Sequence, residues 1–313
     1  MARNKIQFQK GISLNEFMQQ YGSEEQCFAA LYAWRWPKGF ECPLCGHDKH
    51  CEVSARRLQQ CNRCHHQTSI IAGTIFEASK LPLTTWFQGI YLITQGKKGI
   101  SAMQLHRQLG ISYNAAWRMK HKLMQVMLER DSANKLSGFV ELDDAYLGGE
   151  RSGGKVGRGA AGKTPFVAAV ETNNEGHPMR IKLSVVKGFR TKEIERWSRS
   201  HLTAGSTVIS DGLACFNAVV EADCSHDRIV CGGGRASVEE TEFYWVNTIL
   251  GNLKSALRST YHAVRPQYAQ RYLSEFQYRF NRRVDLGQLI PRLAYAAIHT
   301  PPRPERLLKL SLA

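Results

Sequence analysis

The spacing of apolar positions divides the chain into a helical first part and a mixed second part. Apolar residues recur at intervals of three and four between about 12 and 36, which predicts one helix that ends at Pro37. The same spacing predicts a helix over 84–95 and two helices over 100–128, separated by a break at Gly110. The residues between these helices, 40–75, are rich in cysteines and turn-forming residues.

From residue 138 the pattern changes to short apolar runs followed by helical spacing. The order of strands and helices favours a mixed sheet with helices packed on it, an α+β arrangement within the broad α/β class. We expect strands over 139–147, 166–170, 181–186 and 207–210, and helices over 191–201, 239–260 and 267–281.

Charge and cysteine content narrow the class of protein. The 313 residues carry a formal net charge of +15, from 42 Lys and Arg against 27 Asp and Glu, which favours a polyanionic partner such as nucleic acid. A basic protein without such a partner is the alternative. No export signal and no run of roughly 18 apolar residues is present, so we predict a cytoplasmic, nucleoid-associated protein with no membrane contact. Nine cysteines in such a chain favour metal binding over disulfides.

Two C-x-x-C pairs predict a structural zinc site. Cys42 and Cys45 form the first pair, Cys61 and Cys64 the second, and residues 46–60 separate them. Two such knuckles supply four thiolates for one tetrahedral Zn²⁺, and the metal supplies the folding free energy that a segment this small lacks.

The segment 99–123 has the length and the glycine turn of a helix-turn-helix. Its second helix carries polar and basic side chains that suit a DNA groove: Asn114, Arg118, Lys120 and Lys122. An ordinary helical hairpin with a solvated basic face is the alternative.

Acidic residues follow two of the predicted strands. Glu141 and Asp143 share one strand face, Asp144 points to the other, and Asp211 directly follows the strand 207–210. Two such acids from adjacent strands can hold Mg²⁺. On the predicted helix 239–260, Asn247 and Lys254 lie two turns apart on a face away from the apolar stripe. Taken singly, each of these residues also fits an ordinary turn or a solvated helix face.

Together these motifs resemble the bacterial insertion-sequence transposases that carry an amino-terminal zinc ribbon and are related to the Merlin transposons. The resemblance is carried by the ribbon cysteines and by four stretches: Val140–Gly149, Ile209–Gly212, Trp245–Lys254 and Tyr272–Arg283. It implies an RNase H-like core with an Asp-Asp-Glu or Asp-Asp-Asn triad followed by a lysine. The implied catalytic residues are Asp143, Asp211, Asn247 and Lys254, of which the first three hold magnesium.

This chain departs from the family pattern near the third ligand. Many relatives have His and Glu where this chain has Trp245 and Leu250. The neutral Asn247 leaves one charge fewer than an all-acid site, and the fallback acids are Glu239, Glu240 and Glu242.

The resulting hypothesis is a DNA transposase that uses two Mg²⁺ ions, replaceable by Mn²⁺, to cut transposon ends and transfer them into target DNA as a dimer or higher oligomer. Its segments are helices and zinc ribbon (1–80), a helix-turn-helix-like DNA-binding segment (81–136), the catalytic domain (137–285) and a tail (286–313). Besides the four residues of the second helix, we expect DNA contacts from Arg151, Lys155, Arg158, Lys163, Arg258, Arg282 and Arg283.

Two other functions compete with this hypothesis. A non-catalytic DNA-binding regulator or degenerate transposase fits Leu250 and the neutral Asn247. A nuclease that hydrolyses DNA without joining it would differ only in its products.

Overall fold

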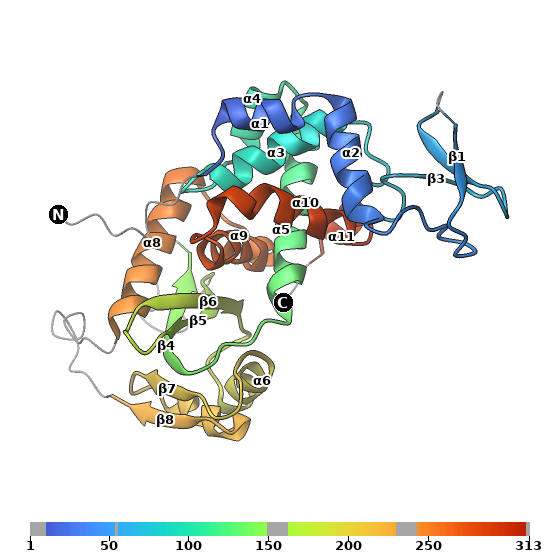
Figure 1. Cartoon of the computed structure of the whole chain (residues 1–313). Coiled ribbons are helices and arrows are strands. Elements are labelled where there is room, and N and C mark those ends of the chain that lie inside the picture. The colour runs from blue at the N-terminus through green and yellow to red at the C-terminus, as the bar shows by residue number, and fades with distance from the viewer. Residues whose placement is uncertain (1–10, 54–55, 149–161, 230–242, 311–313) are drawn as a thin grey trace. The chain divides into compact units, whose positions relative to one another are not determined.

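The computed structural model describes residues 11–53, 56–148, 162–229 and 243–310 of the chain (Figure 1). It divides into two compact units. The first, here the ribbon unit, comprises Met1–Gly96, Ile100–Val126 and Val284–Leu308. The second, the sheet unit, comprises Lys97–Gly99, Met127–Arg283 and Lys309–Ala313. No helix in the described ranges has both the length and the apolar character needed to cross a bilayer.

The ribbon unit begins with two helices where the periodicity predicts one. Helix α1 spans Leu14–Tyr21 and α2 spans Glu24–Arg35, so the prediction of a single helix over 12–36 is wrong. The cause is a capping box: Ser23 accepts a hydrogen bond from the N–H of Gln26, and the Gln26 side chain accepts one from the N–H of Ser23. This reciprocal pair starts a new helix while the apolar spacing continues through it.

The predicted helices over 84–95 and 100–128 are confirmed as α3 (Leu83–Gln95), α4 (Ala102–Leu109) and α5 (Tyr113–Ser132). A three-stranded antiparallel sheet has the order β1-β2-β3. Gly110, at a φ of 64°, makes the left-handed turn that separates α4 from α5. The elements are β1 (His50–Val53), β2 (Leu58–Cys61), β3 (Gln67–Ser69), α3 (Leu83–Gln95), α4 (Ala102–Leu109), α5 (Tyr113–Ser132), η6 (Leu286–Gln288), α10 (Leu289–Ile298) and α11 (Glu305–Leu308), the last turns of α5 belonging to the sheet unit.

The sheet unit contains a five-stranded mixed sheet of order β6-β5-β4-β7-β8. Strands β4, β5 and β6 are antiparallel, and β7 and β8 run parallel to β4. The predicted mixed sheet flanked by helices is therefore confirmed. Its elements are β4 (Phe139–Leu147), β5 (Thr164–Thr172), β6 (Pro178–Val185), α6 (Thr191–His201), β7 (Thr207–Ser210), η3 (Ala214–Ala222), β8 (Ser225–Arg228), α8 (Tyr244–Thr260), η5 (Pro266–Tyr268) and α9 (Ala269–Asn281).

Helices cover both faces of this sheet, and each face has its own apolar core. On one side Val140 and Leu142 of β4 pack with Trp197 of α6 and Phe216 of η3. On the other side Phe166 and Ala168 of β5 pack with residues of α8 and α9. Burial on both faces explains why β5 reads as a continuous apolar run and not as an alternating one.

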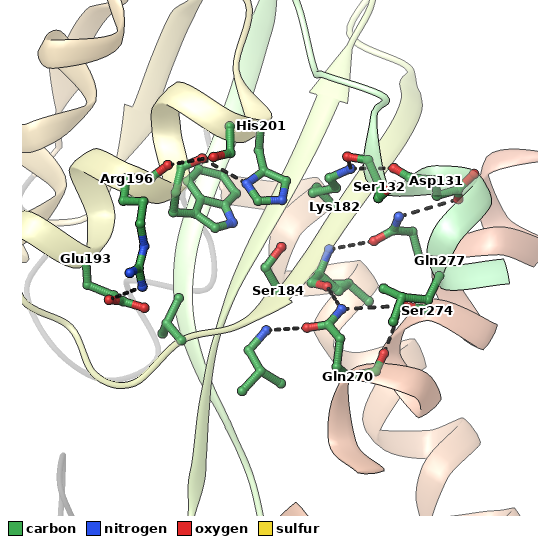
Figure 2. A pocket seen from close by; sticks show the side chains of 16 residues that line it. Asp131, Ser132, Lys182, Ser184, Glu193, Arg196, His201, Gln270, Ser274 and Gln277 are labelled. Carbon is green, nitrogen blue, oxygen red and sulfur yellow. Dashed lines mark hydrogen bonds and ion pairs between the residues drawn. The ribbon is translucent and has the colours of Figure 1, made fainter. Parts of the chain in front are cut away.

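Side-chain amides of α9 cover the outer edge of β6. Three backbone N–H groups of this edge strand donate to α9 side chains at 2.7–2.8 Å, and Figure 2 shows two of the acceptors, Gln270 and Gln277, against the strand. The helix thereby fills hydrogen-bonding positions that another strand would otherwise take. The pairs are Ile181 with Asn281, Leu183 with Gln277, and Val185 with Gln270.

Candidate metal centres and nucleic-acid interface

The four ribbon cysteines form one compact group. Their sulfur atoms all lie within 4.8 Å of one another, and Sγ of Cys42 lies 3.6 Å from that of Cys64, as Sγ of Cys45 does from that of Cys61. A disulfide would need about 2.05 Å. Four sulfurs placed 2.3 Å from a tetrahedral zinc ion would be ~3.8 Å apart. The spacing therefore fits zinc.

Both knuckles use the same backbone geometry. The N–H of Cys42 donates to the carbonyl of His47, and the N–H of Cys61 donates to that of His66. Gly46 and His65 occupy equivalent left-handed positions, with φ of 70° and 56°. The metal-capable group contains cysteines alone, so among the described residues none of the nearby histidines takes the place of a thiol.

The second group lies where the pairing of β4 with β7 ends, in the middle of β4 and directly after the last residue of β7. Carboxylate oxygens of Asp143, Asp144 and Asp211 all lie within 4.8 Å of one another. The strand register explains the meeting: Leu142 of β4 pairs with Ser210, the last residue of β7, so Asp143 and Asp211 are the next residues of two adjacent parallel strands. The predicted convergence of Asp143 and Asp211 is thus present in the structure.

Asp144 joins this group, although strand alternation assigns it to the opposite face. Asp144 lies beyond the last paired residues of β4 and β7. In the part of the chain that the structure describes, no strand is hydrogen-bonded to that side of β4 at this position, so side chains from the two faces can approach each other there. Its carboxylate therefore reaches the other two acids. The sequence motif contains Asp144, but alternation alone gives no reason to include it as a ligand.

Electrostatics in this acid cluster favour a bound cation. Burial and the neighbouring carboxylates of Asp144 and Asp211 raise the pKa of Asp143 to about 7, and Lys254 acts in the opposite direction. Like charges this close are costly unless a cation offsets them. Three carboxylates with half-buried side chains are the oxygen donors that Mg²⁺ and Mn²⁺ prefer.

Helix α8 brings the predicted third ligand to the same strand. The N–H of Val246 donates to Oε2 of Glu141 at 2.7 Å, so the first turn of α8 lies directly against β4. Asn247 follows Val246 and is half-buried. Lys254 is exposed and close enough to Asp143 to lower its pKa. The fallback acids Glu239, Glu240 and Glu242 lie outside the described residues.

Two predicted DNA-contacting residues of α5 are exposed. Asn114 is solvent-exposed at the start of the helix, and Arg118 forms a partly exposed ion pair with Glu305 at 3.4 Å. In the sheet unit Arg258 is exposed and Lys163 is half-buried. Three further predicted residues, Arg151, Lys155 and Arg158, lie outside the described ranges.

Four other predicted DNA contacts are basic residues that the structure buries or already engages within the protein. Lys120 is only 1 % exposed. Lys122 donates to the carbonyl of Ile75 at 2.6 Å. Arg282 forms a nearly buried ion pair with Asp131 at 2.7 Å, and Arg283 donates to main-chain carbonyls. Helical spacing cannot separate such packed cations from solvated ones.

A cavity of about 270 Å³ lies elsewhere in the sheet unit, between β6, α6 and α9 (Figure 2). Many of its lining groups are already paired: Nζ of Lys182 donates to the carbonyls of Asp131 and Asn134, and Nδ1 of His201 bonds the carbonyl of Trp197. None of its lining residues belongs to the acid cluster. The acid cluster, not this cavity, has the chemistry of a reactive site.

Comparison with known protein families gives one match over the acid cluster and another over the ribbon cysteines. Residues 135–281 match the ISXO2-like transposase domain, and residues 22–67 match the transposase zinc-ribbon domain. The first match contains the acid cluster and α8, and the second contains all four ribbon cysteines. A curated relative, described as an uncharacterized protein in transposable element ISH50 of Halobacterium salinarum, is 26 % identical over 279 residues, covering 82 % of this chain and 90 % of the relative.

Proposed function

Because this chain belongs to the ISXO2-like transposases with an amino-terminal zinc ribbon, we propose that it cleaves DNA at transposon ends and joins the freed ends to target DNA. The observation that carries this proposal is the meeting of Asp143 and Asp211 just beyond the paired part of two parallel strands, beside the helix that bears Asn247 and Lys254. These are the residues that the family resemblance implies.

In the proposed mechanism Asp143 and Asp211 would hold the catalytic metal, and Asn247 would complete the ligand set with a neutral amide oxygen. Two Mg²⁺ ions bound there would activate the attacking oxygen and stabilise the leaving one. Lys254, two turns further along α8, supplies a positive charge at the rim of the acid cluster. Its exposed ammonium is suited to hold a DNA phosphate.

Asp144 has a separate role in this proposal. Its N–H donates to Oδ1 of Asp143 at 2.8 Å. This bond orients the Asp143 carboxylate, while the Asp144 carboxylate adds negative charge to the cluster. Asp144 is thereby an additional candidate ligand for a divalent cation.

The ribbon and the basic surface supply DNA binding in the proposal. Zinc held by the four cysteines has a structural role, because a closed tetrahedron leaves no open position for chemistry. Recognition of the terminal repeats would involve the ribbon and the exposed start of α5. Two ends must be joined in one event, so we propose that the protein acts as a dimer or higher oligomer. The proposed contacts are Asn114, Arg118, Lys163 and Arg258, with Arg151, Lys155 and Arg158 from the undescribed segment.

The test is a cleavage and strand-transfer assay on a duplex that carries the element's own terminal repeat. We expect Asp143→Asn or Asp211→Asn to lower both reactions by about 10²–10³-fold while end binding is retained, because neutral amides hold divalent cations weakly. Asp227→Asn is the matched control, since Asp227 is an exposed acid on β8 of the same sheet. Full activity in both site variants would refute the proposal. Cleavage without joining would indicate a nuclease, and end binding without cleavage by the wild type would indicate a regulator.

A further inference from the structure

Glu141 is a buried acid that the proposed reaction does not use. Its residue is 7 % exposed, on β4, and its Oε2 accepts a hydrogen bond from the N–H of Val246 at 2.7 Å. The N–H of Trp245 also bonds this carboxylate. Both donors belong to the first turn of α8, whereas the acceptor comes from a strand about a hundred residues earlier in the chain.

The first turn of α8 needs this acceptor. The first N–H groups of any α-helix have no partner within the helix, and a Ser, Thr, Asp or Asn at the N-cap normally accepts from them. The N-cap of α8 is Phe243, which has no side-chain acceptor. By contrast, α1, α2 and α4 each have a serine N-cap that accepts such a bond. Glu141 therefore caps α8 from the sheet, because its carboxylate accepts from two of these N–H groups.

This cap links the two elements that carry the proposed metal ligands. Glu141 and Asp143 are two residues apart on one strand, so they share a face of the sheet. Asn247 directly follows Val246, which Glu141 holds. The hydrogen bond between Glu141 and Val246 therefore helps to set the distance between Asp143 on β4 and Asn247 on α8.

A second contact holds the same turn. The indole Nε1 of Trp245 donates to the carbonyl of Gly176 at 2.5 Å. Gly176 lies in the turn between β5 and β6, at a φ of 75°. Trp245 is one of the positions at which this chain departs from the family pattern, and here it ties the start of α8 to the antiparallel part of the sheet.

We propose that Glu141 is a positioning residue for the metal site: it fixes the first turn of α8 so that Asn247 faces the Asp143–Asp211 pair at ligand distance. This inference rests on the proposed function of these residues. Glu141 acts through α8 and not as a ligand, since the metal-capable acid group of the described residues contains Asp143, Asp144 and Asp211 but not Glu141. Its carboxylate is instead engaged by backbone N–H groups.

The experiment compares Glu141→Gln with a matched variant in the full-length zinc-loaded protein. Gln keeps the shape of the side chain, but it removes the charge and places an NH₂ group where an acceptor is needed. The control is Glu171→Gln: Glu171 is also a buried glutamate of this sheet, 8 % exposed, and it bonds the N–H of Ser137 and the guanidinium of Arg180. Mn²⁺ binding is measured by the loss of the free-ion signal in electron paramagnetic resonance, and the first turn of α8 is followed by amide hydrogen exchange.

We expect Glu141→Gln to weaken Mn²⁺ binding about tenfold, as loss of a partner behind the ligands commonly does, and to speed exchange of the amides over 244–250. Glu171→Gln should lower the melting temperature but leave both readouts at their wild-type values. Should Glu141→Gln not fold, Glu141→Asp, which keeps the charge on a shorter side chain, is expected to show the same two changes to a smaller extent.

Three results would overturn the inference: unchanged Mn²⁺ binding in the Glu141 variants, unchanged exchange in α8, or an equal loss of Mn²⁺ binding in Glu171→Gln. Failure of the proposed function gives a different pattern. In that case Asp211→Asn would bind Mn²⁺ as well as the wild type does, whatever the Glu141 variants show.

Discussion

The two metal-capable groups are built in opposite ways. The ribbon places four cysteines, as two short C-x-x-C knuckles of identical backbone geometry, around one point. The acid cluster gathers Asp143, Asp144 and Asp211 from two strands, and its proposed completion comes from a helix more than thirty residues after Asp211. The first depends on local chain geometry, and the second depends on the register of a sheet and on the packing of α8.

The two groups also differ in the chemistry that they offer a metal ion. A four-thiolate site is closed and satisfied by its own ligands, so its metal stabilises a fold. The acid cluster has a carboxylate whose pKa is raised to about 7 by burial and by its like-charged neighbours. Such a group is poised to bind a cation with open positions, because ion binding relieves the repulsion. Such repulsion between carboxylates is tolerated only by a scaffold that is stable without the metal.

The largest effect is expected from removing zinc, which should unfold the ribbon and leave the sheet unit folded. Cys42→Ser should abolish zinc binding and unfold β1–β3, since structural zinc contributes on the order of 10 kcal/mol to a fold of this size. The sheet unit should keep its hydrogen-exchange protection, because its two apolar cores contain no ribbon residue. Zinc content and exchange of peptides from each unit measure this.

Cys51→Ser is the matched control for that prediction. Cys51 is an exposed thiol on β1 that does not belong to the four-cysteine group. Zinc content should stay at the wild-type level in this variant. Loss of protection throughout the sheet unit of Cys42→Ser would mean that the two regions do not fold independently.

A smaller effect is expected in the pH dependence of the sheet unit's stability, which does not depend on a bound metal. Burial lowers the pKa of His201 from 6.5 to about 4, and the nearby charges of Lys182 and Lys135 add to the shift. Between pH 6.5 and 4 the unfolded chain binds a proton that the folded unit does not, so stability falls as pH falls through this window. The loss should approach about 2–3 kcal/mol near pH 4.

His201→Gln should flatten this dependence, because glutamine can still donate to the carbonyl of Trp197 but does not titrate. Exchange of amides in α6 as a function of pH measures the effect apart from the ribbon. The half-exposed His177 provides the control: His177→Gln should leave the pH profile unchanged. A wild-type profile that is flat from pH 6.5 to 4 would contradict the prediction.

The smallest expected effect adds the missing charge to the proposed site. Asn247→Asp should tighten Mn²⁺ binding about fivefold to tenfold, since affinity for a hard cation rises with the number of charged oxygen ligands. The free energy of unfolding of the metal-free protein should fall, because a further carboxylate would then repel those of Asp143 and Asp211. Paramagnetic resonance and thermal unfolding without metal give the two readouts.

Asn252→Asp is the control for this last prediction, since Asn252 is an exposed residue of the same helix. It should change neither readout appreciably. If both variants bind Mn²⁺ equally, Asn247 does not approach the metal, and the third ligand must come from elsewhere in the chain.

Sequence reasoning succeeded where the relevant spacing is local. The apolar pattern predicted α6 at its observed bounds and the strands β4 and β7, and the cysteine spacing predicted the four-thiol group. It failed at Gly22–Ser23, where a reciprocal capping bond interrupts a helix without interrupting its apolar period. It also gave no indication that Lys120 is buried or that Arg282 pairs with Asp131, because both follow from packing that the helical period does not contain.

By itself, then, the sequence determined the zinc ribbon, the mixed sheet with its flanking helices, and the identity of the two aspartates that meet. Only the tertiary structure decided that Asp144 joins them and that Glu141 caps the helix carrying Asn247. The reason is physical: a knuckle or a helix period is set by bonds between near neighbours, whereas a side chain's partner across a sheet depends on strand register and helix docking, which the whole core determines together.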